Sequence, residues 1–171
     1  MKTLVATRLG VCLGLLASLV PCAPATASAT NVRVGDPVMA RSVRDALDGA
    51  SRRLERPRCR QVLLDFDDAA GRTLQASLEE RQETPEAYIQ GILFYDGSRN
   101  ERCAKEGVLA FTTRGGRIVF LCAAEVRAQA RRGNSLLLEV ILIHEMLHSL
   151  GLGEDPPSTR EITNRVMSRC G

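Results

Sequence analysis

The feature that most constrains the fold is an apolar stretch, residues 135–150, that contains the pattern His-Glu-x-x-His. Most of its other positions are Leu, Ile, Val or Met, so we expect a helix that is buried on most of its surface. Residues four apart share one face of a helix, and the imidazoles of His144 and His148 can therefore reach a single metal ion. Glu145 lies beside them, where it can take a proton from water. The core must form around this helix.

A metal ion explains the polar groups of this helix better than a purely structural role. The chain has two histidines, and both belong to the pattern. Burying His144, Glu145 and His148 as ordinary core residues, with no compensating ion, would be costly. Zinc suits neutral imidazole and carboxylate ligands, and a catalytic zinc has three protein ligands plus one position for water. The pattern predicts a zinc site with Glu145 as the general base.

The segment from His144 to Glu154 has the spacing of the metzincin motif H-E-x-x-H-x-x-G-x-x-H or D. On these residues the chain resembles the zincin metallopeptidases, and it looks like a member of a small zincin-like family of secreted bacterial proteins. The resemblance covers about eleven residues. It implies that Glu154 is the third zinc ligand and that Gly151 lets the chain turn back beneath the metal. The chain departs from the metzincins in having glutamate at the third position and Met167 in a helical pattern.

Two other carboxylates are alternative third ligands. Asp155 directly follows Glu154, and Glu161 would match the arrangement in which a later helix supplies a glutamate. Glu161 also forms the pattern Ser-x-x-Glu with Ser158, which predicts a capping box at the start of a helix. The sequence leaves this choice open.

The first 29 residues have the pattern of an export signal, and residues 30–171 are expected to form one zincin-like metallopeptidase domain. Lys2 and Arg8 precede an apolar run at residues 9–20, and Ala-Ser-Ala at residues 27–29 is a cleavage pattern. The apolar run is too short for a comfortable membrane span. We therefore expect an exported protein, periplasmic or extracellular, that has no stable membrane insertion.

The charge of the chain limits the kinds of binding partner to expect, and its cysteine content indicates the compartment. Without residues 1–29 the chain keeps 21 of its 23 basic residues and all 20 acidic ones, so it gives no reason to expect nucleic-acid binding. Four cysteines remain, which in an exported protein predicts two disulfides. Three pairings are possible. We favour Cys103 with Cys122, which brackets a hairpin, and Cys59 with Cys170, which ties down the C-terminal tail.

The remaining sequence predicts an α+β fold, with a small mixed β-sheet of about three to four strands packed on the buried His-Glu-x-x-His helix. Residues 30–35 are expected to be a loose terminus. Further helices are predicted over residues 36–54, 71–81, 84–90, 122–132 and 158–170, and strands over residues 61–67, 91–97, 107–112 and 117–122. The last two strands form a hairpin because Gly115 and Gly116 suit a tight turn. By resemblance to zincins, residues 117–121 would pair with an extended substrate.

Together these features predict a secreted, monomeric, zinc-dependent peptidase that acts on a peptide or protein with a zinc-activated water. Glu145 takes the proton from that water and returns it to the leaving amine. Tyr88, Tyr95 or an arginine is available to stabilise the oxyanion. The alternatives are a non-catalytic exported module with a structural or degenerate metal site, and a metal hydrolase that acts on a non-peptide amide.

Overall fold

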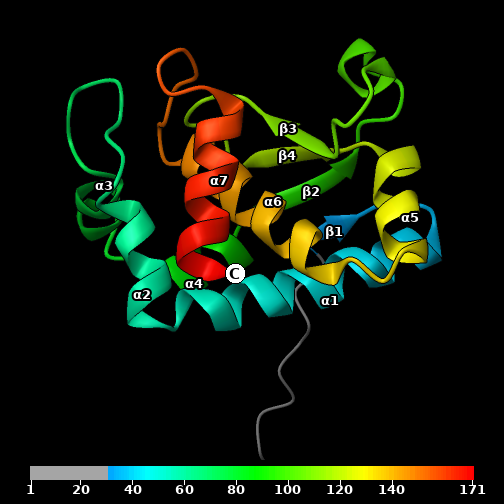
Figure 1. Cartoon of the computed structure of the whole chain (residues 1–171), viewed down its shortest axis with the longest axis horizontal. Coiled ribbons are helices and arrows are strands. Elements are labelled where there is room, and N and C mark those ends of the chain that lie inside the picture. Colours follow the sequence, from blue (N-terminus) through cyan, green and yellow to red (C-terminus); the bar gives the residue numbers. More distant parts are fainter. Residues whose placement is uncertain (1–30) are drawn as a thin grey trace, which may run out of the picture.

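The computed structural model of the chain describes residues 31–171, which form a four-stranded mixed sheet and seven α-helices (Figure 1). The strand order is β1-β2-β4-β3. Strands β1, β2 and β4 are parallel, whereas β3 is antiparallel to β4 and lies at the edge. The strands are β1 (Val32–Arg33), β2 (Leu93–Asp96), β3 (Ala110–Thr112) and β4 (Ile118–Leu121). The fold is α+β with a mixed sheet, as expected from the sequence.

The helices account for most of the described chain. In Figure 1 the strands lie in the upper half and α1 runs along the lower edge. The helices are α1 (Pro37–Leu54), α2 (Pro57–Arg60), α3 (Leu74–Glu80), α4 (Pro85–Gln90), α5 (Ala123–Arg131), α6 (Ser135–Ser149) and α7 (Thr159–Cys170), with 3-10 turns η1 (Gln61–Leu63) and η2 (Glu101–Ala104). Among residues 31–171 no helix has the length and apolarity needed to cross a membrane. The expected export signal lies outside the described residues.

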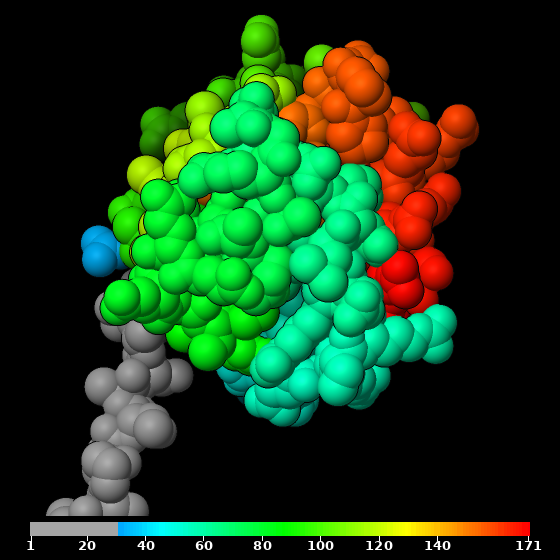
Figure 2. All heavy atoms as spheres, turned by 90° about the vertical axis from the view of Figure 1, so that its left-hand side faces the viewer, coloured from blue at the N-terminus to red at the C-terminus, as the bar shows by residue number. Residues whose placement is uncertain are grey.

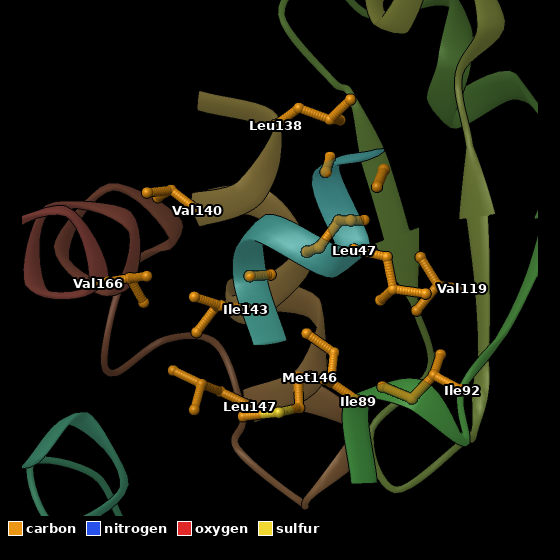
Figure 3. Close-up of a cluster of buried hydrophobic side chains, with 14 of the residues drawn as sticks. Leu47, Ile89, Ile92, Val119, Leu138, Val140, Ile143, Met146, Leu147 and Val166 are labelled. Atoms are coloured by element: carbon orange, nitrogen blue, oxygen red, sulfur yellow. The ribbon is translucent and has the colours of Figure 1, made fainter. Parts of the chain in front are cut away.

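Helix α6 is the centre of the core, as its composition predicts. It packs against α1, α5, α7 and β3. Figure 3 shows Ile143, Met146 and Leu147 of α6 among Leu47 of α1 and Val119 of β4. Because neighbours surround this helix on several sides, its polar residues are buried together with its apolar ones.

The ends of α6 and α7 follow local sequence signals. Asn134 caps α6 by accepting a hydrogen bond from the backbone N–H of Leu137. Gly151 follows the helix with φ of +117°, a conformation that side chains rarely adopt. Ser158 and Glu161 form the predicted capping box at the start of α7. The segment between the two helices is therefore fixed at both ends.

Two expectations about the N-terminal half were wrong. Residues 61–67 do not form a strand: Gln61–Leu63 is a 3-10 turn that continues α2, and its adjacent apolar residues Val62 and Leu63 are both buried. A strand would place such neighbours on opposite faces. Residues 30–35 were expected to be loose, yet Val32–Arg33 pairs with β2. A two-residue strand is too short to show a periodic pattern.

The hairpin was predicted correctly, but its place in the sheet corrects the expected substrate strand. Residues 117–121 were expected to pair with substrate, yet β4 within them already pairs with β2 on one side and β3 on the other. An inner strand has no free backbone edge. Strand β3 occupies the outer position instead.

Both predicted disulfides are present. Cys59 joins Cys170, and Cys103 joins Cys122. The first ties the end of α7 to α2, and the second ties η2 to the residue that follows β4. Disulfides form and persist in oxidising compartments.

Candidate metal site

Three of the predicted site residues converge at the C-terminal end of α6. The Nε2 atoms of His144 and His148 lie 2.9 Å apart. A carboxylate oxygen of Glu154 lies 3.2 Å from Nε2 of His148. One ligand atom from each of the three residues lies within 4.8 Å of those from the other two. This group could hold a metal ion.

The local chain geometry brings Glu154 back to the helix. The backbone N–H groups of Gly151 and Leu152 donate to the carbonyl oxygens of His148 and Leu147 at 3.0 and 3.1 Å. The positive φ of Gly151 turns the chain there. Glu154 is then held by Thr159, whose hydroxyl donates to its carboxylate at 2.8 Å. Local hydrogen bonds therefore fix the third member of the group.

Each histidine has its second ring nitrogen occupied. His148 Nδ1 lies 2.9 Å from the carbonyl oxygen of Leu152, and His144 Nδ1 lies 3.0 Å from the hydroxyl of Thr163. A carbonyl only accepts hydrogen bonds, so Nδ1 of His148 is the donor and carries the proton. A neutral His148 then presents an unprotonated Nε2 to the centre of the group. Metal-ligating histidines commonly donate their other N–H in this way.

The charge state of these groups suits a cation. Burial, and secondarily the neighbouring His148, lower the pKa of His144 to about 3, so its imidazole is neutral near pH 7. Two imidazoles and one carboxylate can supply nitrogen and oxygen lone pairs to a cation. Such a donor set matches the two-nitrogen, one-oxygen ligand set of many catalytic zinc sites. His144, His148 and Glu154 therefore fit the metal that the sequence predicts.

Glu145 lies next to this group but is not part of it. Its side chain is buried, and its Oε2 atom has no hydrogen-bond partner among residues 31–171. Burial, and then the negative charge of Glu154, raise the pKa of Glu145 to about 8 against the opposing effects of Arg102 and the Thr112 backbone. A buried carboxyl with a free oxygen and a raised pKa is suited to proton transfer.

A cavity of about 630 Å³ opens above these residues. One wall is the edge strand β3, and another is α6 with the segment that follows it. The lining includes Ala110, Phe111, Thr112, His144, Glu145, His148, Gly153 and Glu154, together with the basic side chains Arg102, Lys105 and Arg114. The candidate metal ligands and Glu145 are therefore reachable by a molecule of moderate size.

The other candidates from the sequence lie elsewhere. Asp155 and Glu161 are not in the metal-ligand group, and Glu161 instead accepts from the N–H and hydroxyl of Ser158. The Tyr88 hydroxyl donates to the Ser149 carbonyl oxygen at 2.9 Å inside the core. Neither Tyr88 nor Tyr95 lines the cavity, whereas two arginines do.

Sequence reasoning missed the residues that support the ligands. Thr163 and Thr159 lie on α7, 19 and 5 residues beyond the ligands that they contact. No local pattern distinguishes them from other surface threonines of a helix. Their role depends on how α7 packs against α6.

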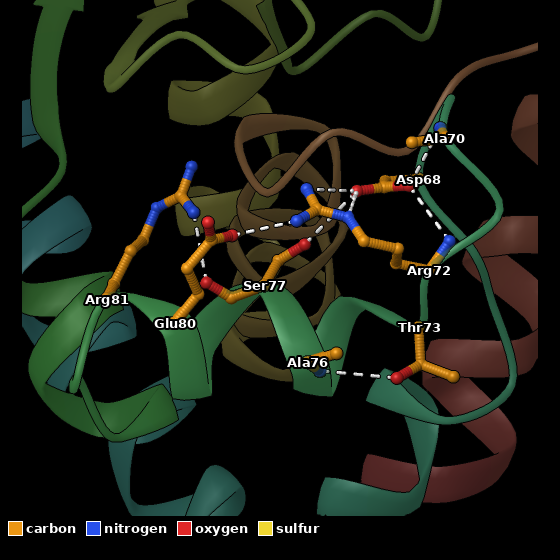
Figure 4. Close-up of polar contacts among 8 residues, drawn as sticks. All are labelled: Asp68, Ala70, Arg72, Thr73, Ala76, Ser77, Glu80 and Arg81. Atoms are coloured by element: carbon orange, nitrogen blue, oxygen red, sulfur yellow. Dashed lines mark hydrogen bonds and ion pairs between the residues drawn. The ribbon is translucent and has the colours of Figure 1, made fainter.

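A loop from a distant part of the chain supports Gly151. Asp68 accepts hydrogen bonds from the backbone N–H groups of Ala70 and Arg72 and from the Arg72 guanidinium (Figure 4). These contacts, the Arg72 backbone first, lower the pKa of Asp68 to about 2. A Cβ at Gly151 would lie only 3.1 Å from Cβ of Asp68. Figure 2 shows this end of the molecule, where the teal segment lies beside the orange segment that follows α6.

Comparison of the chain with protein-family models, curated proteins and solved structures finds no match.

Proposed function

We propose that this protein is a zinc-dependent peptidase with a zincin-like fold, in which His144, His148 and Glu154 hold the metal and Glu145 is the general base. The observation that carries the proposal is the convergence of two imidazoles and a carboxylate at the wall of an open cavity, beside a buried carboxyl with an oxygen that has no hydrogen-bond partner among residues 31–171. A metal ion would take one ligand atom from each of these three residues, all of which lie within 4.8 Å of one another.

The open cavity supports a catalytic site over a purely structural one. Structural zinc sites are closed by four protein ligands, whereas catalytic sites keep one position free. Within residues 31–171 the group contains three ligand residues and lies in the cavity wall. The non-catalytic alternative has no comparable observation in its favour.

The edge strand supports a peptide as substrate. Among residues 31–171, strand β3 pairs with β4 alone, and it lines the cavity, so its outer edge faces the space that an extended chain would occupy. Pairing of a peptide with a sheet edge supplies main-chain hydrogen bonds with little sequence selectivity. We therefore assign pairing with the substrate to β3, and not to β4, for which it was expected from the sequence.

The chemistry divides between the metal and the residues of the chain. Zinc, when bound, supplies Lewis acidity, which makes water acidic near neutral pH and polarises a carbonyl group. A cation held by His144, His148 and Glu154 would favour the ionised form of the Glu145 carboxyl, against the effect of its burial. Glu145 then accepts the proton of the attacking water and delivers it to the amine that leaves.

The supporting contacts keep the ligands in place. Thr163 and the Leu152 carbonyl fix the ring orientations of His144 and His148, and Thr159 fixes the carboxylate of Glu154. Because these partners are already present, the ligand atoms are preorganised and little reorganisation is needed on metal binding.

Zinc analysis combined with peptide digestion tests the proposal. The chelator-treated and reloaded protein is expected to hold one equivalent of zinc and to cleave members of a broad peptide library. Glu145→Gln should keep the zinc and lose cleavage by at least about 100-fold. Glu55→Gln, at an exposed position in the chain bend after α1, is the matched control and should cleave normally.

Three outcomes contradict the proposal or parts of it. Less than half an equivalent of bound zinc after loading would contradict the proposed metal site. One equivalent of zinc without cleavage of any peptide would favour the non-catalytic module or a non-peptide amide substrate. Equal cleavage by Glu145→Gln would remove Glu145 as the base.

A further inference from the structure

We propose that the cavity selects acidic peptides, through Arg102 and Lys105 at one end of β3 and Arg114 at the other. This inference rests on the proposed peptidase function and adds the substrate class to it. All three basic side chains line the same cavity as His144 and Glu145.

Arg102 and Lys105 lie where β3 begins. The disulfide between Cys103 and Cys122 holds η2 next to the end of β4. That end is also where β3 begins, because Ala110 pairs with Leu121. The Arg102 guanidinium lies 5.3 Å above the ring of Phe111 in β3. A covalent bond and a cation–π contact therefore keep this positive charge at the cavity.

Arg114 lies at the opposite end of the strand, in the turn between β3 and β4. The turn is joined to the candidate metal site because the N–H of Gly115 donates to the carbonyl oxygen of His148 at 2.9 Å. The guanidinium of Arg114 lies directly against Gly153, where any side chain would overlap it. The absence of a side chain at Gly153 thus lets the Arg114 guanidinium lie in its present position.

The three cations are available to a ligand. Arg102, Lys105 and Arg114 are exposed, and none of them forms an ion pair within residues 31–171. By contrast, Arg117, close to Arg114 in sequence, is paired with Glu83. The carboxylates in the cavity lining are Glu145 and Glu154, and a divalent ion held by the site would balance both. The loaded cavity then has an excess positive charge.

The arrangement places positive charge on both sides of the metal position. A peptide extended along β3 would pass Arg102 and Lys105 at one end and Arg114 at the other. Acidic side chains on either side of the cleaved bond would meet these cations, whereas basic side chains would be repelled. Attraction of this kind weakens as salt concentration rises.

Peptide binding to the zinc-loaded Glu145→Gln protein tests the proposal without relying on turnover. Three labelled peptides share one Ala-Gly frame and carry Glu, Gln or Lys at two positions that flank the central bond. The Glu peptide is expected to bind at least about 10-fold more tightly than the Gln peptide, and the Lys peptide least. Equal binding of the Glu and Gln peptides would overturn the proposal.

Charge-removing variants then locate the effect. Two variants are made in the Glu145→Gln protein: the double substitution Arg102→Gln with Lys105→Gln, and the single substitution Arg114→Gln. Each should weaken binding of the Glu peptide about 5-fold or more and leave binding of the Gln peptide unchanged. Arg131→Gln with Arg132→Gln, two exposed arginines at the end of α5, is the charge-matched control and should have little effect. An equal loss in this control would show that net charge, not the cavity, attracts the peptide.

Cleavage by the zinc-loaded native chain separates this proposal from the one on which it rests. Cleavage of the Gln peptide as fast as the Glu peptide would keep the peptidase and overturn the preference. Selective binding of the Glu peptide, lost in the cavity variants and followed by no cleavage, would keep the preference and overturn the peptidase.

Discussion

Nδ1 of His148 lies 2.9 Å from the carbonyl oxygen of Leu152, one helical turn further along the chain. This contact fixes the tautomer of the histidine and also holds the turn that follows α6. Because Glu154 lies two residues beyond Leu152, the orientation of one candidate ligand and the position of another depend on the same contact. The helix and the turn therefore act as one unit in forming the site.

Gly151 should be hard to replace. Gly151→Ala is expected to destabilise the protein by about 1–3 kcal/mol, because alanine disfavours φ of +117° and its Cβ would approach that of Asp68. Zinc affinity should fall as well, since Glu154 would move. Urea unfolding and zinc titration measure both effects. Gly133→Ala, at φ of +66° with open space around it, is the control and should cost less and leave zinc affinity unchanged.

The third ligand can be identified with amide variants that keep side-chain size. Glu154→Gln is expected to lower zinc affinity by about 10- to 100-fold, because it removes the negative charge nearest His148. Asp155→Asn and Glu161→Gln should bind zinc normally. Asparagine tolerates the positive φ at residue 155, and glutamine can keep the capping box at residue 161. A larger loss in either of these two variants would reassign the ligand.

Thr163 should matter for the metal more than for stability. Thr163→Val keeps the side-chain shape but removes the hydroxyl 3.0 Å from His144 Nδ1. We expect zinc affinity to fall about 10-fold in competition with a chelator. Ser168→Ala, at an exposed position of the same helix, is the control. If both variants bind zinc like the native chain, Thr163 does not orient His144.

In the metal-free protein, the contribution of Glu145 to stability should fall as pH rises from about 4.5 to about 8. In this range the folded state retains the Glu145 proton, since its pKa is raised to about 8, while the unfolded chain has released it. Glu145→Gln removes this dependence. The difference in unfolding free energy between the two proteins should therefore change by about 2–4 kcal/mol between pH 5 and pH 8. An unchanged difference in urea unfolding would contradict the raised pKa.

The two disulfides should contribute unequally. Removing Cys59–Cys170, whose residues are 111 apart, is expected to cost about 5 kcal/mol, and removing Cys103–Cys122, 19 apart, about 3 kcal/mol. The longer loop restricts the unfolded chain more. Paired Cys→Ala variants, compared by denaturant unfolding, measure both values. A larger loss for Cys103–Cys122 would mean that η2 stabilises the fold beyond this entropic effect.

Local sequence patterns determined the elements nearest the site. The apolar run predicted a buried α6, and the Ser158–Glu161 pair predicted where α7 begins. The turn at Gly151 was also expected. These signals act over one or two helical turns, so they are visible in the sequence itself. The hairpin of β3 and β4 was predictable for the same reason.

Tertiary packing decided what the local patterns left open. The parallel pairing of β1 and β4 with β2 joins segments far apart in the chain, which makes β4 an inner strand and β3 the edge. The contact of Thr163 with His144 and the position of Arg102 at the cavity likewise depend on how α7 and η2 pack against the rest of the chain. The sequence alone determined the spacing of the two histidines along α6. The surroundings of that pair depend on long-range contacts, whose energies are set by the whole fold and not by neighbouring residues.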